Sequence, residues 1–279
     1  MSRYLLGIDI GTSSTKALIV GEDGKNYGLG QVKYDIQTPK PSWSEQDPEL
    51  WWKSVVIAIK EASLKTDLSG GIINAIGLSG QMHGMVLLDE AGKVLRPSII
   101  WADQRTKEEV QDYYKIIGKE NLAKMTANRV AVGFLGPSLL WVKKHEPELY
   151  KQIRWVLLPK DYIRYRLTGV VATESTDASG TLLFDTANRM WSYEMISKLG
   201  LETDYLPPCF EPWELAGYLT EKAAAEIGLP ALTTVALGGA DQPMQAIGNG
   251  IVNPGVVSIT IGTGGRCLRL AVKHVMIQI

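Results

Sequence analysis

Residues 4–20 read YLLGIDIGTSSTKALIV, two apolar runs joined by a short stretch of glycine, serine and threonine. The first run, Tyr4 to Ile10, ends at Gly11, and the second begins at Thr15. Residues 22–25 then read EDGK, and an Asp-Gly pair favours the positive φ angles of a tight turn. A third apolar run continues to residue 36. Strand, turn, strand, turn, strand predicts an antiparallel meander.

Helices and buried strands alternate after this meander. Asp47 and Pro48 suit the N-cap and the first position of a helix, and apolar residues then recur at helical spacing up to Ala62. Further helices are predicted over about 105–118, 137–145 and 160–167, and buried strands over 72–78, 85–88, 234–238 and 256–261. The alternation predicts an α/β domain with a mixed sheet.

Charge and cysteine content narrow the class of protein. The 279 residues carry 29 basic and 30 acidic side chains, so no basic excess points to nucleic acid and no apolar stretch points to a membrane. The charged residues of about 105–121 are interpreted as a solvent-facing helix surface. Two distant cysteines, Cys209 and Cys267, form no C-x-x-C motif and indicate a reducing compartment. The amino terminus does not read as a signal peptide, and we therefore expect a cytoplasmic protein.

The first candidate motif is residues 9–16, DIGTSSTK. Asp9 ends an apolar strand, Gly11 permits a tight turn, and the small hydroxyl residues leave backbone amides able to face an anion. Amides and hydroxyls suit a phosphate, and a neighbouring carboxylate suits Mg²⁺. No G-x-x-x-x-G-K-[ST] loop occurs in the chain. An ordinary hairpin with a solvated Asp9 remains the alternative.

The second motif, GQMHG at residues 80–84, directly follows a predicted buried strand. Ligand sites in open α/β sheets lie where strands end. Gln81 and His83 offer donors and acceptors for sugar hydroxyls, and Met82 offers an adaptable apolar wall. The alternative is a structural loop whose histidine is satisfied by the backbone.

The third motif, GGADQ at residues 238–242, also follows a buried strand. Its glycines permit close approach to the backbone, and Asp241 could accept a proton from a hydroxyl nucleophile. The alternative is a helix N-cap aspartate.

The fourth motif, IGTGG at residues 261–265, repeats the chemistry of the first. Two such turns could hold the phosphates of one nucleotide from two sides. A plain glycine-rich hairpin is the alternative.

The order of these motifs resembles the FGGY family of carbohydrate kinases, whose fold is similar to that of ribonuclease H, actin and hexokinase. Residues 9–16, the WSEQDP stretch at 43–48 and GGAD at 238–241 carry the family resemblance. Stretches that look like xylulose kinases in particular are residues 80–84, 101–106, 158–162 and 177–185. The resemblance covers residues 3 to 265.

The resemblance implies ATP- and Mg²⁺-dependent phosphorylation of D-xylulose at its 5-hydroxyl. Asp241 would be the general base, and Asp9 would help to hold Mg²⁺ through water. The sugar-contacting residues that it implies are Gln81, Met82, His83, Trp101, Asp103, Arg105 and Gln242. The ATP-contacting residues that it implies are Gly11, Thr12, Ser13, Lys16, Gly262, Thr263 and Gly264. Many relatives carry Asn at the position of Gln242.

The resemblance also divides the chain. It implies an amino-terminal sugar-binding domain over residues 1–252 and the first strands of a truncated nucleotide-binding lobe over 253–279. The partners would be a small sugar and ATP, and a homodimer is left open. Two alternatives stand beside the xylulose kinase: a sister kinase for another ketose or polyol, and a non-catalytic sugar-binding fragment.

Overall fold

The computed structural model describes residues 3–66, 72–261 and 265–270. The predicted Gly262, Thr263 and Gly264 therefore lie outside the described residues. Within the described ranges no helix is long and apolar enough to cross a membrane. Cys209 is half-buried, Cys267 is exposed, and neither forms a disulfide.

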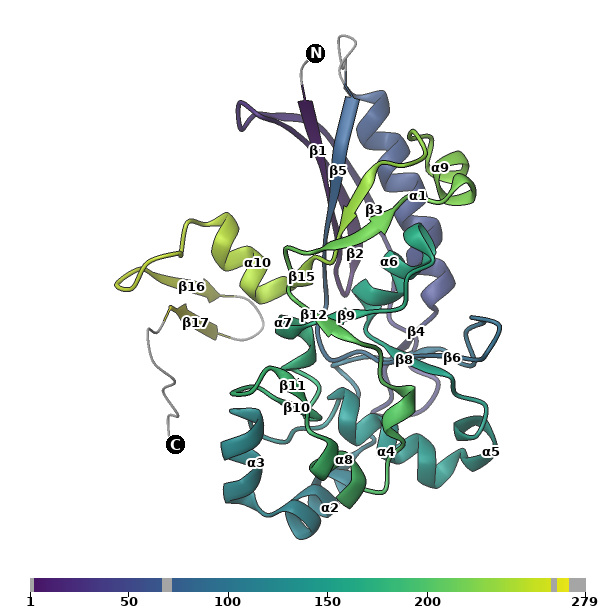
Figure 1. Cartoon of the computed structure of the whole chain (residues 1–279), viewed down its shortest axis with the longest axis vertical. Helices are drawn as coiled ribbons and strands as arrows, with labels where there is room; N and C mark the ends of the chain where they lie inside the picture. Colours follow the sequence, from purple (N-terminus) through teal and green to yellow (C-terminus); the bar gives the residue numbers. More distant parts are fainter. Residues whose placement is uncertain (1–2, 67–71, 262–264, 271–279) are drawn as a thin grey trace.

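A mixed sheet forms the upper part of the molecule in Figure 1. Its strands run in the order β13-β14-β5-β1-β2-β3, and β15 also pairs with β5. The meander β1–β2–β3 is antiparallel, whereas β14 and β15 run parallel to β5 and β5 runs parallel to β1. The bounds are β1 Arg3–Ile10, β2 Ser14–Gly21, β3 Asn26–Lys33, β5 Ile72–Gly80, β13 Leu215–Tyr218, β14 Thr234–Ala236 and β15 Gly239–Ala240. The predicted meander and mixed sheet are confirmed, although β3 ends three residues earlier than expected.

Helix α1 (Pro48–Leu64) packs closely on this sheet, with Asp47 as its N-cap as predicted. The close approach depends on glycines in β3. A Cβ at Gly30 would lie 1.9 Å from the carbonyl oxygen of Ala58, and one at Gly28 would lie 2.2 Å from that of Ala62. Trp51, on the inner face of α1, is fully buried. It lies in a core that the sheet shares with α1, α6 (Pro159–Thr168) and α9 (Glu221–Ile227).

A second hydrophobic core fills the lower, mainly helical part of the molecule (Figure 1). Its helices are α2 Lys107–Ile117, α3 Lys119–Thr126, α4 Leu135–His145, α5 Pro147–Tyr150 and α8 Tyr193–Lys198, followed by the 3₁₀ turn Thr203–Tyr205. The helices predicted near 105–118, 137–145 and 160–167 are confirmed. The solvent-facing surface predicted for 105–121 is wrong at Glu109, which is 1% exposed and accepts a hydrogen bond from Lys144 (3.2 Å).

Short strand pairs lie outside the main sheet, and the β6–β8 pair contributes side chains to both cores. The pairs are β4 Glu45–Gln46 with β7 Ser98–Ile99, β6 Val86–Leu88 with β8 Trp155–Leu157, β9 Thr173–Glu174 with β12 Cys209–Phe210, and β10 Phe184–Asp185 with β11 Met190–Trp191. Helix α7 (Ser175–Ala178) lies between them, below β15 in Figure 1.

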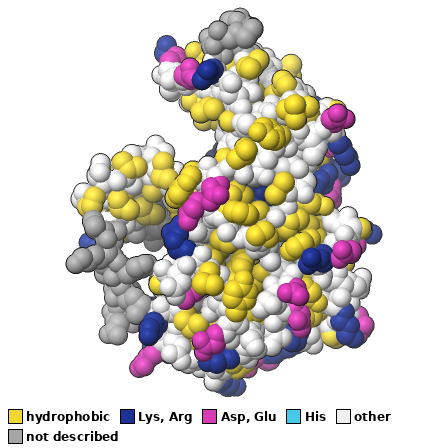
Figure 2. Space-filling model, in the orientation of Figure 1, with side chains coloured by type: hydrophobic (Ala, Val, Ile, Leu, Met, Phe, Trp, Pro, Cys, Tyr) yellow, Lys and Arg dark blue, Asp and Glu magenta, His cyan; other side chains and the backbone are white. Residues whose placement is uncertain are grey.

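Helix α10 (Asp241–Gly248) and the hairpin of β16 (Val257–Ile261) and β17 (Gly265–Arg269) project to one side of the sheet (Figure 1). The strand predicted over 256–261 forms at Val257–Ile261, and among the described residues it pairs with β17 alone. The expectation that it is buried is wrong, because Val257 is 49% exposed and Ile259 is 71% exposed. Figure 2 shows the hollow between this projection and the upper part of the molecule. The predicted boundary at residue 252 falls between α10 and β16 and stays a prediction.

Candidate active site

Two of the predicted motifs meet at the end of one strand. Asp9 of β1 and Gly239 of β15 both lie opposite Ser79 of β5, on its two sides. Neighbouring strands are about 4.8 Å apart, so the two flanking strands are separated by only ~10 Å. Asp241 follows β15 directly. The fold therefore brings the carboxylates of Asp9 and Asp241 to the same edge of the sheet.

The Asp9 carboxylate lies in a partly buried, electrostatically crowded position. Burial raises the pKa of Asp9, the positive charge of Lys16 opposes this, the carboxylate of Asp241 adds to it, and a hydrogen bond with Ser79 lowers it. Asp9 is therefore partly buried rather than fully solvated at the β1–β2 hairpin.

The turn after Asp9 is held from behind by Tyr34. The Tyr34 hydroxyl donates to the Gly11 carbonyl oxygen (2.7 Å), and the Gly11 N–H donates to the carbonyl of Ser14 (3.0 Å). Burial is the main cause that raises the pKa of Tyr34 to about 12, so the phenol stays protonated and able to donate. Ser13 and Lys16 are exposed at this turn, where an anion could reach them.

A network of uncharged groups joins this turn to the loop after β5. The Trp101 indole N–H donates to Thr12 Oγ1 (2.8 Å), and Thr12 Oγ1 donates to Gln81 Oε1 (3.3 Å). Gln81 Nε2 donates to Gln46 Oε1 (2.9 Å), and Gln46 Nε2 donates back to the Thr12 carbonyl (2.8 Å). Gln46 is 1% exposed and also accepts a hydrogen bond from Trp51 (3.2 Å). We call these residues the amide network.

His83 is fixed by the backbone. Its φ angle is 69°, its ring stacks on Phe134 at 3.8 Å, and its Nδ1 lies 2.8 Å from the carbonyl oxygen of Gly180. A carbonyl oxygen can only accept, so Nδ1 carries the proton in this arrangement. A Cβ at Gly180 would lie 3.0 Å from His83 and 3.1 Å from Met82, so both side chains pack closely against this glycine. The backbone-satisfied histidine foreseen as the alternative is thus present, and a sugar contact by His83 stays a prediction.

Asp103 and Arg105 are buried together behind the site. Asp103 is 0% exposed, and both of its oxygens accept from Arg105 at 2.7–3.0 Å. Arg105 also pairs with Glu45 (2.7 Å) and stacks over Trp43. Both side chains are thus paired inside the protein, although Arg105 Nη1 has no hydrogen-bond partner among the described residues. A sugar contact by either residue stays a prediction. Trp101, in contrast, is 48% exposed.

Asp241 is the first residue of α10, and the N-cap of that helix is Ala240. The N-cap alternative for Asp241 is therefore wrong. The turn before it requires glycine, because Gly238 has a φ of 80° and a Cβ there would lie 2.2 Å from the carbonyl oxygen of Leu78.

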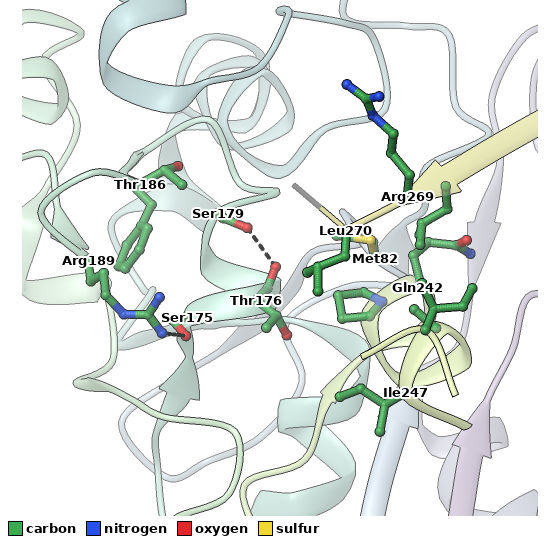
Figure 3. Close-up of a pocket in the computed structure, with 15 residues that line it drawn as sticks. Met82, Ser175, Thr176, Ser179, Thr186, Arg189, Gln242, Ile247, Arg269 and Leu270 are labelled. Atoms are coloured by element: carbon green, nitrogen blue, oxygen red, sulfur yellow. Dashed lines mark hydrogen bonds between the residues drawn. The ribbon is translucent and has the colours of Figure 1, made fainter. Parts of the chain in front are cut away.

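A cavity of about 560 Å³ opens beside α10. Two residues predicted to contact the sugar, Met82 and Gln242, line it together. Figure 3 shows hydroxyl-bearing residues of the α7 segment across from α10. None of them was predicted as a site residue from the sequence. They are Ser175, Thr176 and Ser179. The DASGT stretch that begins at residue 177 was the signal that could have found this wall.

A Mg²⁺ site needs few protein ligands. The described residues contain no group of three or more His, Cys, Asp or Glu side chains placed to hold a metal. Mg²⁺ is bound by one or two carboxylates together with waters and substrate phosphates, so it needs no such group. Asp9 is a carboxylate at this edge of the sheet, and its role in holding Mg²⁺ stays a prediction.

Comparison with known proteins decides the family. Residues 4–248 match the amino-terminal domain of the FGGY family of carbohydrate kinases. The chain belongs to this family. Its fold is accordingly the mixed α/β domain of the actin-like ATPases, as the sequence predicted.

Relatives within the family include xylulose kinases. The chain is 41% identical over 266 residues to a Bacillus subtilis xylulose kinase, covering 95% of this chain and 53% of that protein. A Brucella ovis structure named as a xyloylose kinase is 40% identical with a TM-score of 0.88, covering 94% of this chain and 54% of that one. A Lactobacillus acidophilus gluconate kinase is 27% identical with a TM-score of 0.90, covering 96% and 54%. The chain thus spans about half the length of the relatives it matches.

Proposed function

We propose that this chain supplies the sugar-binding half and the catalytic base of an ATP- and Mg²⁺-dependent D-xylulose kinase that makes D-xylulose 5-phosphate. The observation that carries the proposal is the placement of Asp9 and Asp241 on either side of β5, with the Met82–His83 loop continuing from the same strand. A strand end with two carboxylates and a polar loop suits the transfer of a phosphoryl group to a sugar hydroxyl.

Asp241 would act on the nucleophile. As the 5-hydroxyl oxygen bonds to the γ-phosphorus of ATP, the bond from that phosphorus to the oxygen of ADP breaks, and the hydroxyl proton passes to the Asp241 carboxylate. General base catalysis of this kind typically contributes ~10²–10⁴-fold.

Asp9 and the turn that follows it would serve the nucleotide. Mg²⁺, when bound, neutralises charge on the phosphates. Asp9 would hold it through water, and the amides and hydroxyls of residues 11–13 would face the phosphates. The amide network then links this turn to the sugar loop through Thr12 and Gln81.

Xylulose is favoured over other sugars by the names of the similar proteins. The resemblance of residues 80–84 to xylulose kinases favours it as well. A sister kinase remains the second candidate, because a gluconate kinase shares the fold equally well, with a TM-score of 0.90. Calorimetry on the 279-residue chain with D-xylulose, D-ribulose, glycerol and gluconate separates the two. Tighter binding of any of the last three would replace xylulose as the substrate.

Turnover requires the other half of the relatives' length. The joined enzyme for this assay consists of residues 1–248 of this chain continued by the second half of the Bacillus subtilis xylulose kinase. We expect Asp241→Asn to lower its kcat at least ~10²-fold while sugar affinity persists, because the amide keeps the shape and loses the proton acceptor. Asp47→Asn is the matched control, since asparagine caps a helix as well as aspartate. A loss of less than about tenfold in kcat would remove Asp241 as the base.

The third reading, a sugar-binding fragment without catalysis, applies to the 279-residue chain alone. We expect this chain to bind sugar weakly and to transfer no phosphate at a useful rate, because phosphoryl transfer depends on gripping the nucleotide from both sides. A coupled kinase assay on the purified chain tests this. Robust turnover, with host kinase excluded, would contradict it.

A further inference from the structure

The residue before Asp241 is tied to a distant part of the chain. The backbone N–H of Ala240 donates to Thr176 Oγ1 (3.0 Å), a hydrogen bond between residues 64 positions apart. Ala240 is the N-cap of α10, so this bond fixes the point at which the helix begins. Asp241 is the next residue, and its direction into the site depends on that point.

Thr176 is itself held by a buried carboxylate. Glu174 Oε2 accepts both the backbone N–H and the hydroxyl of Thr176, each at 2.7 Å, and Glu174 Oε1 accepts the N–H of Asp177 (3.0 Å). Because the Thr176 hydroxyl proton points at Glu174, its oxygen presents lone pairs to Ala240. Hydrogen bonds in such a chain polarise and strengthen one another.

Glu174 belongs to a group of five charged residues that are all 0% exposed, which we call the buried ion cluster. Lys160 Nζ lies 2.8 Å from Asp161, 3.5 Å from Glu174 and 3.5 Å from Asp177. Arg164 pairs with Asp161 at 2.7 Å. Lys160 Nζ also donates to the Leu237 carbonyl (3.5 Å), so the cluster contacts the segment before Asp241 near its start, and through Thr176 at its end.

The charges of the cluster balance only if one carboxyl group keeps its proton. Three acids face two bases, and a net charge at this depth costs several kcal/mol. Among the three acids, Asp177 accepts no hydrogen bond from a described residue, and Lys160 Nζ lies 3.5 Å from its Oδ2. Burial raises the pKa of Asp177 well above its usual range, Lys160 opposes this, and the carboxylates of Glu174, Asp161 and Asp241 add to it.

We propose that Thr176 is a positioning residue for Asp241 and that the buried ion cluster holds Thr176 in place. The catalytic meaning of this inference rests on the proposed function of Asp241, but the mechanical link does not. Thr176 also lines the 560 Å³ cavity, so the link connects the sugar pocket wall to the base.

The test uses the 279-residue chain and three variants. Thr176→Val removes the hydroxyl at constant shape, Thr176→Ser keeps it, and Thr66→Val removes a hydroxyl that bonds the Ala62 carbonyl (2.7 Å) at the far end of α1. The readouts are amide hydrogen exchange at Ala240 and the ¹³C titration of the Asp241 carboxyl.

We expect Thr176→Val to speed exchange at Ala240 about tenfold or more and to displace the Asp241 titration midpoint. Thr176→Ser restores both values, and Thr66→Val changes neither. Unchanged exchange and titration in Thr176→Val would overturn the inference, as would failure of serine to restore them. Calorimetry with D-xylulose separates the two proposals. If the chain binds no xylulose, the proposed function fails while the exchange result still decides the positioning role.

Discussion

Asp9 and Asp241 stand at the same edge of the sheet but are held there by different chemistry. Behind Asp9 lies the amide network, in which Gln46, Gln81 and Thr12 exchange hydrogen bonds between uncharged groups. Behind Asp241 lies the buried ion cluster, whose members are fully enclosed. Removing one member of a neutral network costs about a hydrogen bond, whereas removing one member of a buried ion group leaves an uncompensated charge. Asp241 should therefore be the more sharply positioned of the two carboxylates, and its support should be the more sensitive to mutation.

The largest expected effect tests this sensitivity. We expect Lys160→Met to lower the free energy of unfolding by ~3–5 kcal/mol, because three buried carboxyl groups would face Arg164 alone. Urea denaturation of the 279-residue chain measures it. Lys198→Met, which breaks an exposed pair with Glu194 (2.6 Å), is the control and should cost less than ~1 kcal/mol. Equal losses of stability in the two variants would show that the buried ion cluster is no more sensitive to mutation than an exposed ion pair.

The amide network should show a smaller loss. Gln46→Leu removes the partner of Thr12, Trp51 and Gln81, and we expect a cost of ~1–3 kcal/mol in the free energy of unfolding. Gln152→Leu, at an exposed glutamine bonded to the Glu148 carbonyl (2.9 Å), serves as the matched control. If Gln46→Leu lowered the free energy of unfolding as much as Lys160→Met, the amide network would be as sensitive to the loss of one member as the buried ion cluster.

A binding measurement tests the loop of residues 80–84, which follows β5 between Asp9 and Asp241. We expect His83→Ala to weaken D-xylulose binding by roughly 5- to 150-fold, the equivalent of one lost hydrogen bond, while the affinity of the joined enzyme for an ATP analogue is unchanged. His145→Ala, at the ring that stacks on Trp141, is the control. Similar losses for sugar and nucleotide would identify His83 as a structural residue only.

The smallest effect concerns the pH dependence of stability. The pKa of Asp9 is raised in the folded chain, so its contribution to stability is full below the ordinary value near 3.8 and is lost as pH rises through the folded pKa. Asparagine does not titrate. Asp9→Asn should therefore melt at a higher temperature than the parent at pH 7, by a margin that shrinks toward pH 4. A margin that grows on acidification would reverse the sign of the shift.

The site could be predicted from the sequence where function coincides with strand ends. Asp9, Asp241 and the loop at 80–84 each follow a buried run, and parallel strands bring such ends together. The amide network and the buried ion cluster could not be predicted in this way. Lys160 and Asp161 sit in a helical stretch whose charges suggest solvent, and their partner Glu174 lies beyond the helix. The link from Thr176 to Ala240 has no local signature at all.

Two residues predicted to contact the sugar have surroundings that the sequence did not reveal. Asp103 and Arg105 were chosen because their stretch resembles the family, yet they pair with one another and with Glu45 in the interior. A stretch that resembles a family can contain buried structural residues as well as ligand contacts. The complete burial of the Asp103 side chain, 0% exposed, could not be predicted from the stretch itself.

The two cysteines give this chain a convenient handle for spectroscopy. Burial and nearby carboxylates raise the pKa of Cys209 to about 12, so its thiol is almost entirely protonated at neutral pH and slow toward alkylating reagents. Cys267 is exposed on β17. A maleimide dye added at neutral pH should therefore mark the hairpin beside α10 and little else. A single fluorophore could report on ligands arriving at the cavity without any cysteine having to be engineered in or out.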